Sequence, residues 1–185
     1  MPEAIEAELP PSRWVERYAH LVHTGAALLD VAAGRGRHAR LFASRGARVT
    51  AVDRDAAALA ALDGVAGVRT QLVDIEGGPW PFGDTRFDAI VVTNYLHRPV
   101  IDTLLGALAP DGALIYETFA AGNERHGRPS NPDFLLDAGE LLERIRGALT
   151  VVAFEQGEIL APRPAVVQRL AAVGRGRAWP PLLEP

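Results

Sequence analysis

The stretch ALLDVAAGRGRHARLF, residues 27–42, predicts a buried strand that runs into a glycine corner and then into a helix. Its first part is a continuous apolar run, which is typical of a strand covered on both faces. Gly34 and Gly36 follow, and glycines at such a corner allow the backbone to approach another group closely. That group is a phosphate, a nucleoside or only a neighbouring strand, and the rest of the sequence has to distinguish these cases.

The same alternation of strand and helix continues along the chain, which predicts a mostly parallel sheet covered by helices on both faces. We expect strands at 26–32, 48–52, 68–73, 87–93 and 113–119, and helices at 12–23, 35–44, 56–62, 100–108 and 137–146. Two further apolar stretches, 149–155 and 165–173, predict an antiparallel hairpin. The predicted fold is therefore α/β and Rossmann-like, a doubly wound sheet of seven strands with a C-terminal antiparallel hairpin. We expect a single domain over residues 1–185, with loosely ordered tails at 1–11 and 174–185.

Composition excludes several classes of function. The net charge of −4 and the pI near 5.7 argue against a general nucleic-acid-binding protein. The chain has no cysteine, which excludes disulfides, thiolate catalysis and cysteine metal sites and suits a reducing cytoplasm. All basic residues are arginines, so a Schiff-base lysine and a phosphate-loop lysine are absent. The acidic N-terminus lacks the features of a signal peptide, and no apolar run approaches the ~20 residues of a membrane span. His20, His23 and His38 lack partners at metal-ligand spacing, so we expect no metal.

Acidic side chains end three of the predicted strands. Asp30 lies near the end of the first predicted strand, and Asp53 and Asp74 directly follow the second and third. In doubly wound sheets, ligands bind beyond the carboxyl ends of the strands. Asp53, at the end of the second strand, is placed to accept hydrogen bonds from both hydroxyls of a ribose. Asp74 could accept a hydrogen bond from the exocyclic amine of adenine. The set predicts a pocket for an adenosine-containing cofactor.

Two cofactors compete for this pocket. The pattern Gly34-x-Gly36-x-x-Ala39, with Asp53 downstream, formally matches the dinucleotide fingerprint. However, Asp30 lies just ahead of the glycines, whereas a pyrophosphate prefers an uncharged approach, and the chain is too short for a separate substrate domain. S-adenosylmethionine carries an ammonium and a sulfonium and no phosphate, so an acidic corner suits it. The alternatives without a ligand are a tight strand–helix turn at the glycines, a helix cap at Asp53 and a turn cap at Asp74.

The run LLDVAAGRGRHARLFASRGARVTAVDRD resembles the first two motifs of the class I S-adenosylmethionine-dependent methyltransferases. FDAIVVTNYLH and LAPDGALIYETF resemble the family's fourth and fifth strands, so the resemblance covers about residues 26–120. The nearest subgroup is the small bacterial tellurite-resistance type. The sequence departs from the commonest pattern at Ala32 and Ala33, where many members have Gly-Cys, but both replacements are small.

The resemblance implies a role for each matching position. Asp30 and the backbone from Ala33 through Gly34 to Gly36 would hold the methionine end of the cofactor. Asp53, with the adjacent Arg54, would hold the ribose, Asp74 and Ile75 would frame the adenine, and Asn94 would lie beside the transferred methyl group. The implied activity is methyl transfer to a small-molecule acceptor. The alternatives are an NAD(P)-dependent oxidoreductase and a non-catalytic S-adenosylmethionine-binding module.

Catalytic candidates follow the fourth predicted strand. His97 is either a general base or a packing residue, and Tyr95 is the second candidate. Methyl transfer often needs only alignment of the nucleophile, so a base is optional. On position alone, Arg98, Glu117, His126 and Arg128 are candidate substrate contacts. The connector 120–136 is unusually long, as functional loops often are, and its Arg125 and Arg128 suggest either an anionic substrate or a solvated loop. Nothing in the sequence indicates the oligomeric state.

Overall fold

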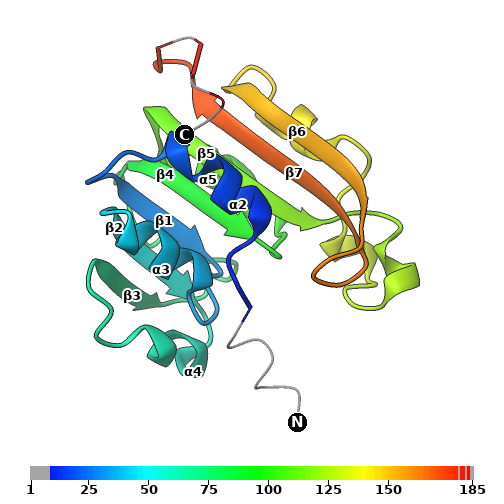
Figure 1. Ribbon diagram of the computed structural model, residues 1–185, viewed down its shortest axis with the longest axis horizontal. Coiled ribbons are helices and arrows are strands. Elements are labelled where there is room, and N and C mark those ends of the chain that lie inside the picture. The colour runs from blue at the N-terminus through cyan, green and yellow to red at the C-terminus, as the bar shows by residue number, and fades with distance from the viewer. Residues whose placement is uncertain (1–8, 179, 182, 184–185) are drawn as a thin grey trace.

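The computed structural model describes residues 9–178, 180–181 and 183, and shows one seven-stranded sheet (Figure 1). The strand order is β3-β2-β1-β4-β5-β7-β6. Adjacent strands from β3 to β5 in this order pair in parallel, whereas β7 pairs antiparallel with both β5 and β6. The strands are β1 (Ala27–Val31), β2 (Arg48–Asp53), β3 (Val68–Leu72), β4 (Phe87–Thr93), β5 (Leu108–Phe119), β6 (Leu149–Ile159) and β7 (Ala165–Gly174). The predicted fold class is confirmed.

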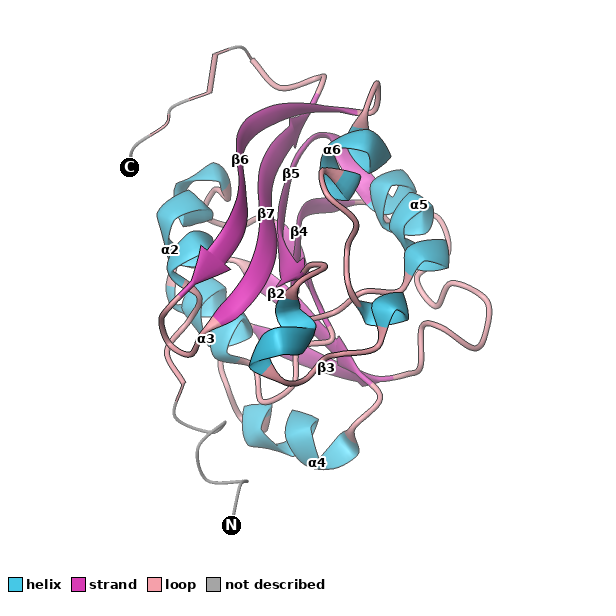
Figure 2. Ribbon diagram, turned by 90° about the vertical axis from the view of Figure 1, so that its right-hand side faces the viewer, coloured by secondary structure: helices cyan, strands magenta, loops and turns pink. Residues whose placement is uncertain are grey.

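Helices cover both faces of the sheet (Figure 2). The α-helices are α2 (Arg13–Tyr18), α3 (Arg37–Ser44), α4 (Ala56–Leu59), α5 (Arg98–Ala107) and α6 (Glu140–Ile145). Short 3-10 helices follow or link them: η1 (Ala19–Leu21), η2 (Ala60–Leu62), η3 (Asn123–His126) and η4 (Pro132–Phe134). Side chains of α2, α3 and α4 pack into one hydrophobic core, and those of α5 and α6 into a second core on the opposite face. Both faces of the central strands are thus buried, which explains their continuous apolar sequences.

Several elements differ in length from the sequence-based expectation. The helix predicted at 12–23 becomes α2 followed by η1, and the helix at 137–146 shortens to α6. The hairpin strands extend further, because β6 continues to Ile159 and the connecting loop is only 160–164. β5 begins at Leu108 instead of 113, with a register shift against β4 between Phe87 and Ala89. Backbone pairing across the sheet decides these boundaries, and local sequence does not show it.

The expected tail at 174–185 is attached at its beginning. Gly174 closes β7, the amide of Gly176 donates to the carbonyl of Pro110 at 2.8 Å, and the Arg177 guanidinium donates to the carbonyl of Leu21 at 2.6 Å. Residues 1–8 of the expected N-terminal tail, and residues 179, 182, 184 and 185, lie outside the described residues. No helix in the described part of the chain is long and apolar enough to cross a membrane.

The strand order reverses at β1, which has β2 on one side and β4 on the other. This point is where doubly wound sheets bind ligands. The glycine corner predicted from the sequence lies here, between β1 and α3. Gly36 is the N-cap of α3 with φ +79°, and a Cβ at this position would lie 2.3 Å from the buried Leu62 side chain. Gly34 has φ +54°, and a Cβ there would meet no described atom within 4 Å. Gly36 therefore serves packing, whereas Gly34 faces open space.

This difference predicts unequal costs for two matched substitutions. Both Gly34→Ala and Gly36→Ala pay the strain of a left-handed alanine, about 1 kcal/mol. Gly36→Ala adds overpacking against Leu62, so we expect its total loss in the free energy of unfolding to be about 2 kcal/mol or more. Urea denaturation of both variants measures the difference. Equal losses would contradict the assignment of Gly36 to packing.

Candidate active site

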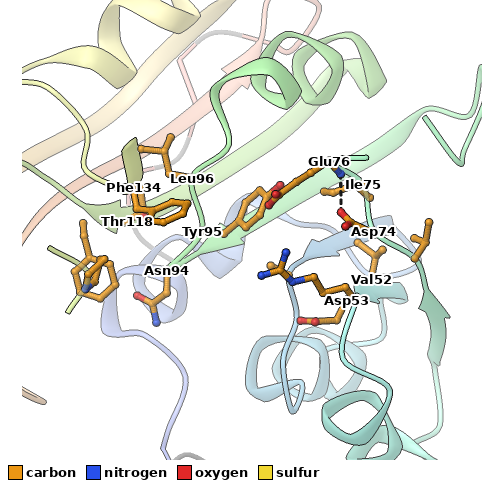
Figure 3. Close-up of a pocket in the computed structure, with 15 residues that line it drawn as sticks. Val52, Asp53, Asp74, Ile75, Glu76, Asn94, Tyr95, Leu96, Thr118 and Phe134 are labelled. Carbon is orange, nitrogen blue, oxygen red and sulfur yellow. Dashed lines mark hydrogen bonds between the residues drawn. The ribbon is translucent and has the colours of Figure 1, made fainter. Parts of the chain in front are cut away.

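Two cavities lie beyond the carboxyl ends of the parallel strands, with volumes of about 290 and 680 Å³. Ala32, Asp53 and Asn94 line both, so the cavities adjoin at the ends of β1, β2 and β4. In the smaller cavity, Asp53 and Asp74 lie on one side, Thr118 and Phe134 on the other, and Tyr95 between them (Figure 3). The larger cavity follows the glycine corner, and Ala33, Gly34, Arg35 and Gly36 are among its lining residues.

Asp53 joins the end of β2 to the glycine corner. Its Oδ2 accepts a hydrogen bond from the amide of Gly34 at 2.8 Å, and its Oδ1 accepts one from the amide of Asp55 at 2.9 Å. The N-cap of α4 is Asp55, which accepts from the amides of Ala57 and Ala58, so the alternative that Asp53 caps this helix is wrong. Each Asp53 oxygen keeps a second acceptor site, which fits a carboxylate that binds paired hydroxyls.

Asp30 is a buried carboxylate behind the glycine corner. It is 1% exposed, and neither oxygen has a hydrogen-bond partner among the residues that the structure describes. Burial raises its pKa to about 7, and the opposing influences of the Ala39 amide and the Arg37 charge are smaller. The amide of Ala39 lies close to the carboxylate but outside hydrogen-bonding geometry. Asp30 lines neither cavity, so any influence on a ligand acts through the field of its charge.

A second buried group, His38, ties the N-terminal segment to the site. Its Nε2 accepts a hydrogen bond from the amide of Ser12 at 3.0 Å, so the neutral ring carries its proton on Nδ1 and donates to Thr93 Oγ1 at 3.2 Å. Burial lowers the pKa of His38 to about 3, which keeps the ring neutral. Leu9 and Pro11 thereby lie on the wall of the larger cavity. Sequence reasoning missed this contact, because a lone histidine gives no signal for a partner so far along the chain.

The adenine-side candidates lie together at the end of β3. Asp74 and Ile75 line the smaller cavity, as does Arg54 from the end of β2. Asp74 Oδ1 accepts from the amide of Glu76 at 2.9 Å, so this residue caps its own turn, as the alternative interpretation expected, and also faces the cavity. The two interpretations are compatible.

Two non-glycine residues at the cavity boundary have strained backbones. Ala32 has φ +51° and Asn94 has φ +54°, at the ends of the neighbouring strands β1 and β4. Left-handed conformations of such residues are uncommon and cluster at functional sites. The amide of Asn94 donates to the carbonyl of Glu117 at 2.9 Å, which fixes it between the two cavities.

The two catalytic candidates are placed differently. Tyr95 lines the smaller cavity, and its buried hydroxyl has no hydrogen-bond partner in the described part of the chain. Burial, and then the charge of Glu76, raise the pKa of Tyr95 above its ordinary value. His97 lines neither cavity; it is the N-cap residue of α5, and its Nδ1 lies 3.9 Å from Glu76 Oε2. Glu76 itself lines the cavity and was missed, although its position two residues after Asp74 was a usable signal.

The residues named as substrate contacts by position are mostly engaged within the protein. Arg98 pairs with Glu140 at 2.8 Å, and Glu117 pairs with Arg169 at 2.5 Å. Arg125 and His126 both pair with Glu158, at 2.9 and 3.0 Å. Arg128 precedes Pro129, which does line the smaller cavity. Within the described residues, no group of three or more acidic, histidine or cysteine side chains is arranged to hold a metal ion.

Comparisons with known proteins identify the type of domain. A family model described as a methyltransferase domain matches residues 28–112, and a search of curated proteins finds no match. TehB from Haemophilus influenzae has a similar structure, with a TM-score of 0.71 at 18% identity over 88% of this chain and 61% of that chain. The TehB-like S-adenosylmethionine-dependent methyltransferase from Corynebacterium glutamicum has a TM-score of 0.66 at 18% identity, with 92% of both chains covered.

A third structure is 25% identical to this chain, with a TM-score of 0.62 over 87% of this chain and 76% of that chain. It is the 1,6-didemethyltoxoflavin-N1-methyltransferase from Burkholderia thailandensis, bound to 1,6-didemethyltoxoflavin and S-adenosylhomocysteine. This chain spans 61% of the length of TehB, so TehB contains sequence with no counterpart here. The family match begins within β1 and covers the glycine corner and the strand ends around it, so residues 28–112 of this chain are similar to a methyltransferase domain.

Proposed function

We propose that this protein transfers a methyl group from S-adenosylmethionine to a small-molecule acceptor. The observation that carries the proposal is the placement of the Asp53 carboxylate at the boundary of both cavities, beside the open space at Gly34. The structure of the Burkholderia thailandensis enzyme, with a small acceptor and the demethylated cofactor bound, supports the same class of reaction.

The residues present fit this cofactor. Asp53 is placed to accept hydrogen bonds from the ribose hydroxyls, with Arg54 beside it, and Asp74 and Ile75 to frame the adenine. Gly34, between Ala33 and Gly36, leaves room along the larger cavity for the methionine end. A buried carboxylate without a partner, Asp30, favours the approach of a positively charged group to this corner.

The same contacts disfavour a dinucleotide. A pyrophosphate at a glycine-rich corner needs backbone N–H groups to bind it. Here the amide of Gly34 is already donated to Asp53, and a second carboxylate, Asp30, lies behind the corner. The proposed cofactor has no phosphate, so it does not need a free amide at Gly34 and is not repelled by the Asp30 carboxylate.

The bound cofactor would supply a methyl group on a sulfonium centre. The chain's own residues would align the acceptor and exclude water. Asn94, fixed by its bond to Glu117, would border the reacting position. Tyrosine keeps its proton at neutral pH, and burial raises the pKa of Tyr95 further, so its hydroxyl would act as a hydrogen-bond donor to the acceptor. His97, outside both cavities, would accept a proton only by way of Glu76.

Calorimetric titration tests the cofactor site. We expect wild-type protein to bind S-adenosylhomocysteine, and Asp53→Asn to weaken this binding by about tenfold or more, because charge-assisted hydrogen bonds to the ribose are lost. Asp102→Asn, which removes an exposed carboxylate on α5, is the matched control and should not change the affinity. Absence of heat from the wild type, or binding of NAD in its place, would overturn the proposal.

The buried Asp30 predicts a pH dependence of stability. Because its pKa is raised from 3.8 to about 7 on folding, the folded state binds the extra proton between these values, and stability falls as pH rises through this window. Above it, the ionised carboxylate costs roughly 4 kcal/mol of unfolding free energy. We therefore expect Asp30→Asn to be more stable than wild type at about pH 8 and to lose this advantage toward about pH 4.

Urea denaturation across this pH range measures the difference. Asp102→Asn again serves as the control, since an exposed carboxylate should give no such trend. Saturating S-adenosylhomocysteine, whose ammonium would interact with Asp30, should narrow the gap between Asp30→Asn and wild type. A difference that is constant with pH would contradict the ionisation behaviour assigned to Asp30.

A further inference from the structure

The smaller cavity has one apolar wall, opposite Asp53 and Asp74 (Figure 3). It is formed by the end of β4, the end of β5 and the loop 120–136, through Tyr95, Leu96, Phe119, Pro129 and Phe134. Phe134 is 51% exposed, which is a high exposure for a phenylalanine. An exposed aromatic ring on a cavity wall is a surface on which a planar apolar ligand can pack.

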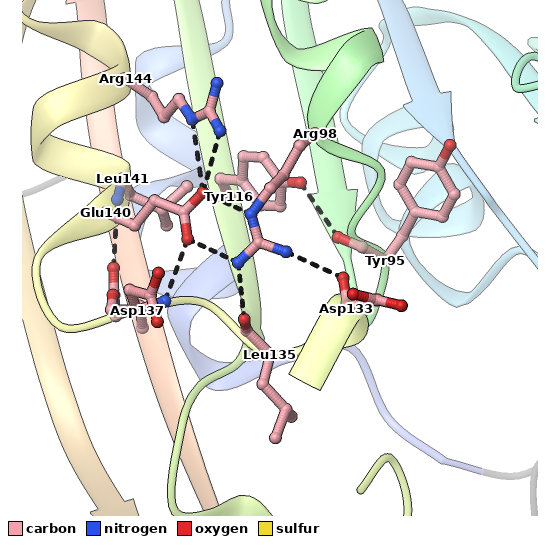
Figure 4. A network of polar contacts seen from close by, with 10 residues as sticks. Tyr95, Arg98, Tyr116, Asp133, Leu135, Asp137, Glu140, Leu141 and Arg144 are labelled. Carbon is pink, nitrogen blue, oxygen red and sulfur yellow. Dashed lines mark hydrogen bonds and ion pairs between the residues drawn. The ribbon is translucent and has the colours of Figure 1, made fainter. Parts of the chain in front are cut away.

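The backbone on both sides of Phe134 is held by one arginine (Figure 4). Arg98 donates from Nη1 to the carbonyl of Asp133 at 3.0 Å and from Nη2 to the carbonyl of Leu135 at 2.8 Å. The same guanidinium forms a bidentate pair with Glu140, with both N–O distances 2.8 Å. Arg98 and Glu140 are largely buried, at 29% and 11% side-chain exposure. Arg98 therefore fixes the backbone on both sides of Phe134 and keeps this residue at the cavity.

The charges around this wall do not suit an anion. Arg98 is paired with Glu140 and uses four of its five N–H donors within the protein, and Arg125 and His126 are paired with Glu158. Arg54 lines the cavity on the β2 side, next to Asp53. Arg128 precedes the lining residue Pro129 in the chain but does not itself line the cavity. Glu76 and Asp74 face the cavity from the end of β3. An anionic acceptor against Phe134 would face the carboxylates of Asp74 and Glu76, and the residues that line its own side of the cavity contribute no cation.

We propose that this apolar wall is the acceptor subsite, and that it takes a small, uncharged, aromatic molecule packed against Phe134. The inference deepens the methyltransferase function and rests on it. It also favours the solvated-loop alternative over an anionic substrate at the basic loop, because Arg98 holds the wall and Arg125 pairs with Glu158, while Arg128 does not line the cavity. Arg98 is a positioning residue, because it acts on the subsite only through Phe134.

Paired probes test the charge preference. Indole is neutral, and indole-3-carboxylate carries the same ring with an anion at about pH 7.5. Each is titrated into protein saturated with S-adenosylhomocysteine and into protein without it, with binding followed by saturation-transfer NMR. We expect indole to bind about tenfold more tightly than the carboxylate, since a desolvated anion without a partner is costly. Equal or tighter binding of indole-3-carboxylate would overturn the proposal.

Three variants locate the subsite. Phe134→Ala should weaken indole binding by about fivefold or more and leave the affinity for S-adenosylhomocysteine unchanged. Leu160→Ala, at an apolar residue 79% exposed in the β6–β7 loop, is the matched control and should change neither affinity. Glu76→Gln should improve binding of indole-3-carboxylate, because it removes a facing negative charge. Indole binding that is unaffected by Phe134→Ala would overturn the assignment of the wall.

The two proposals fail in different ways. If S-adenosylhomocysteine binds and indole binds without regard to Phe134, the subsite is wrong and the cofactor site stands. If indole binds in a Phe134-dependent manner and S-adenosylhomocysteine does not bind, the cavity takes aromatic ligands but the methyltransferase function fails. Arg98→Met, with its melting temperature measured in parallel, should reduce indole binding and retain cofactor affinity, which separates loss of positioning from loss of the fold.

Discussion

The hydrogen bonds that Asp53 accepts from the amides of Gly34 and Asp55 are the contacts on which the cleft depends. They join the corner after β1 to the end of β2 and to the start of α4, and so fix the boundary that the two cavities share. A carboxylate suits this position because it can accept backbone N–H groups and retain free lone pairs for a ligand. The same side chain thus shapes the corner and faces the cavity, so its structural and functional interpretations do not compete.

Two buried titratable groups behind the corner respond to burial in opposite ways. Burial raises the pKa of Asp30 and lowers that of His38, and in each case the neutral form is favoured. His38 is satisfied by Ser12 and Thr93, so its neutrality stabilises the contact between the N-terminal segment and β4. Asp30 has no such partner among the described residues, so both of its buried oxygens are left without a hydrogen bond.

The apolar wall of the smaller cavity depends on Arg98, whose ion pair with Glu140 connects α5 to α6. The same guanidinium donates hydrogen bonds to the backbone carbonyls on both sides of Phe134. An arginine is needed here because a guanidinium reaches two carbonyls and both oxygens of a carboxylate at once. The loop 120–136 has only short 3-10 helices of its own, and the contacts of Arg98 hold its Phe134 end, while the bridge between Ala120 and Leu136 and the hydrogen bonds of Asn123 hold the rest.

The sequence by itself determined the parallel sheet, the antiparallel hairpin, the glycine corner and the acidic residues at the strand ends, since these follow from hydrophobic periodicity and local turn chemistry. Asp53, Asp74 and Asn94 were found in this way, and all line the cleft. Only the tertiary structure decided that Gly36 packs against Leu62, that Glu76 and Phe134 line the cavity, and that Arg98 is structural. These assignments depend on contacts between residues far apart in the chain, and side-chain partners at such separations leave no pattern in one sequence.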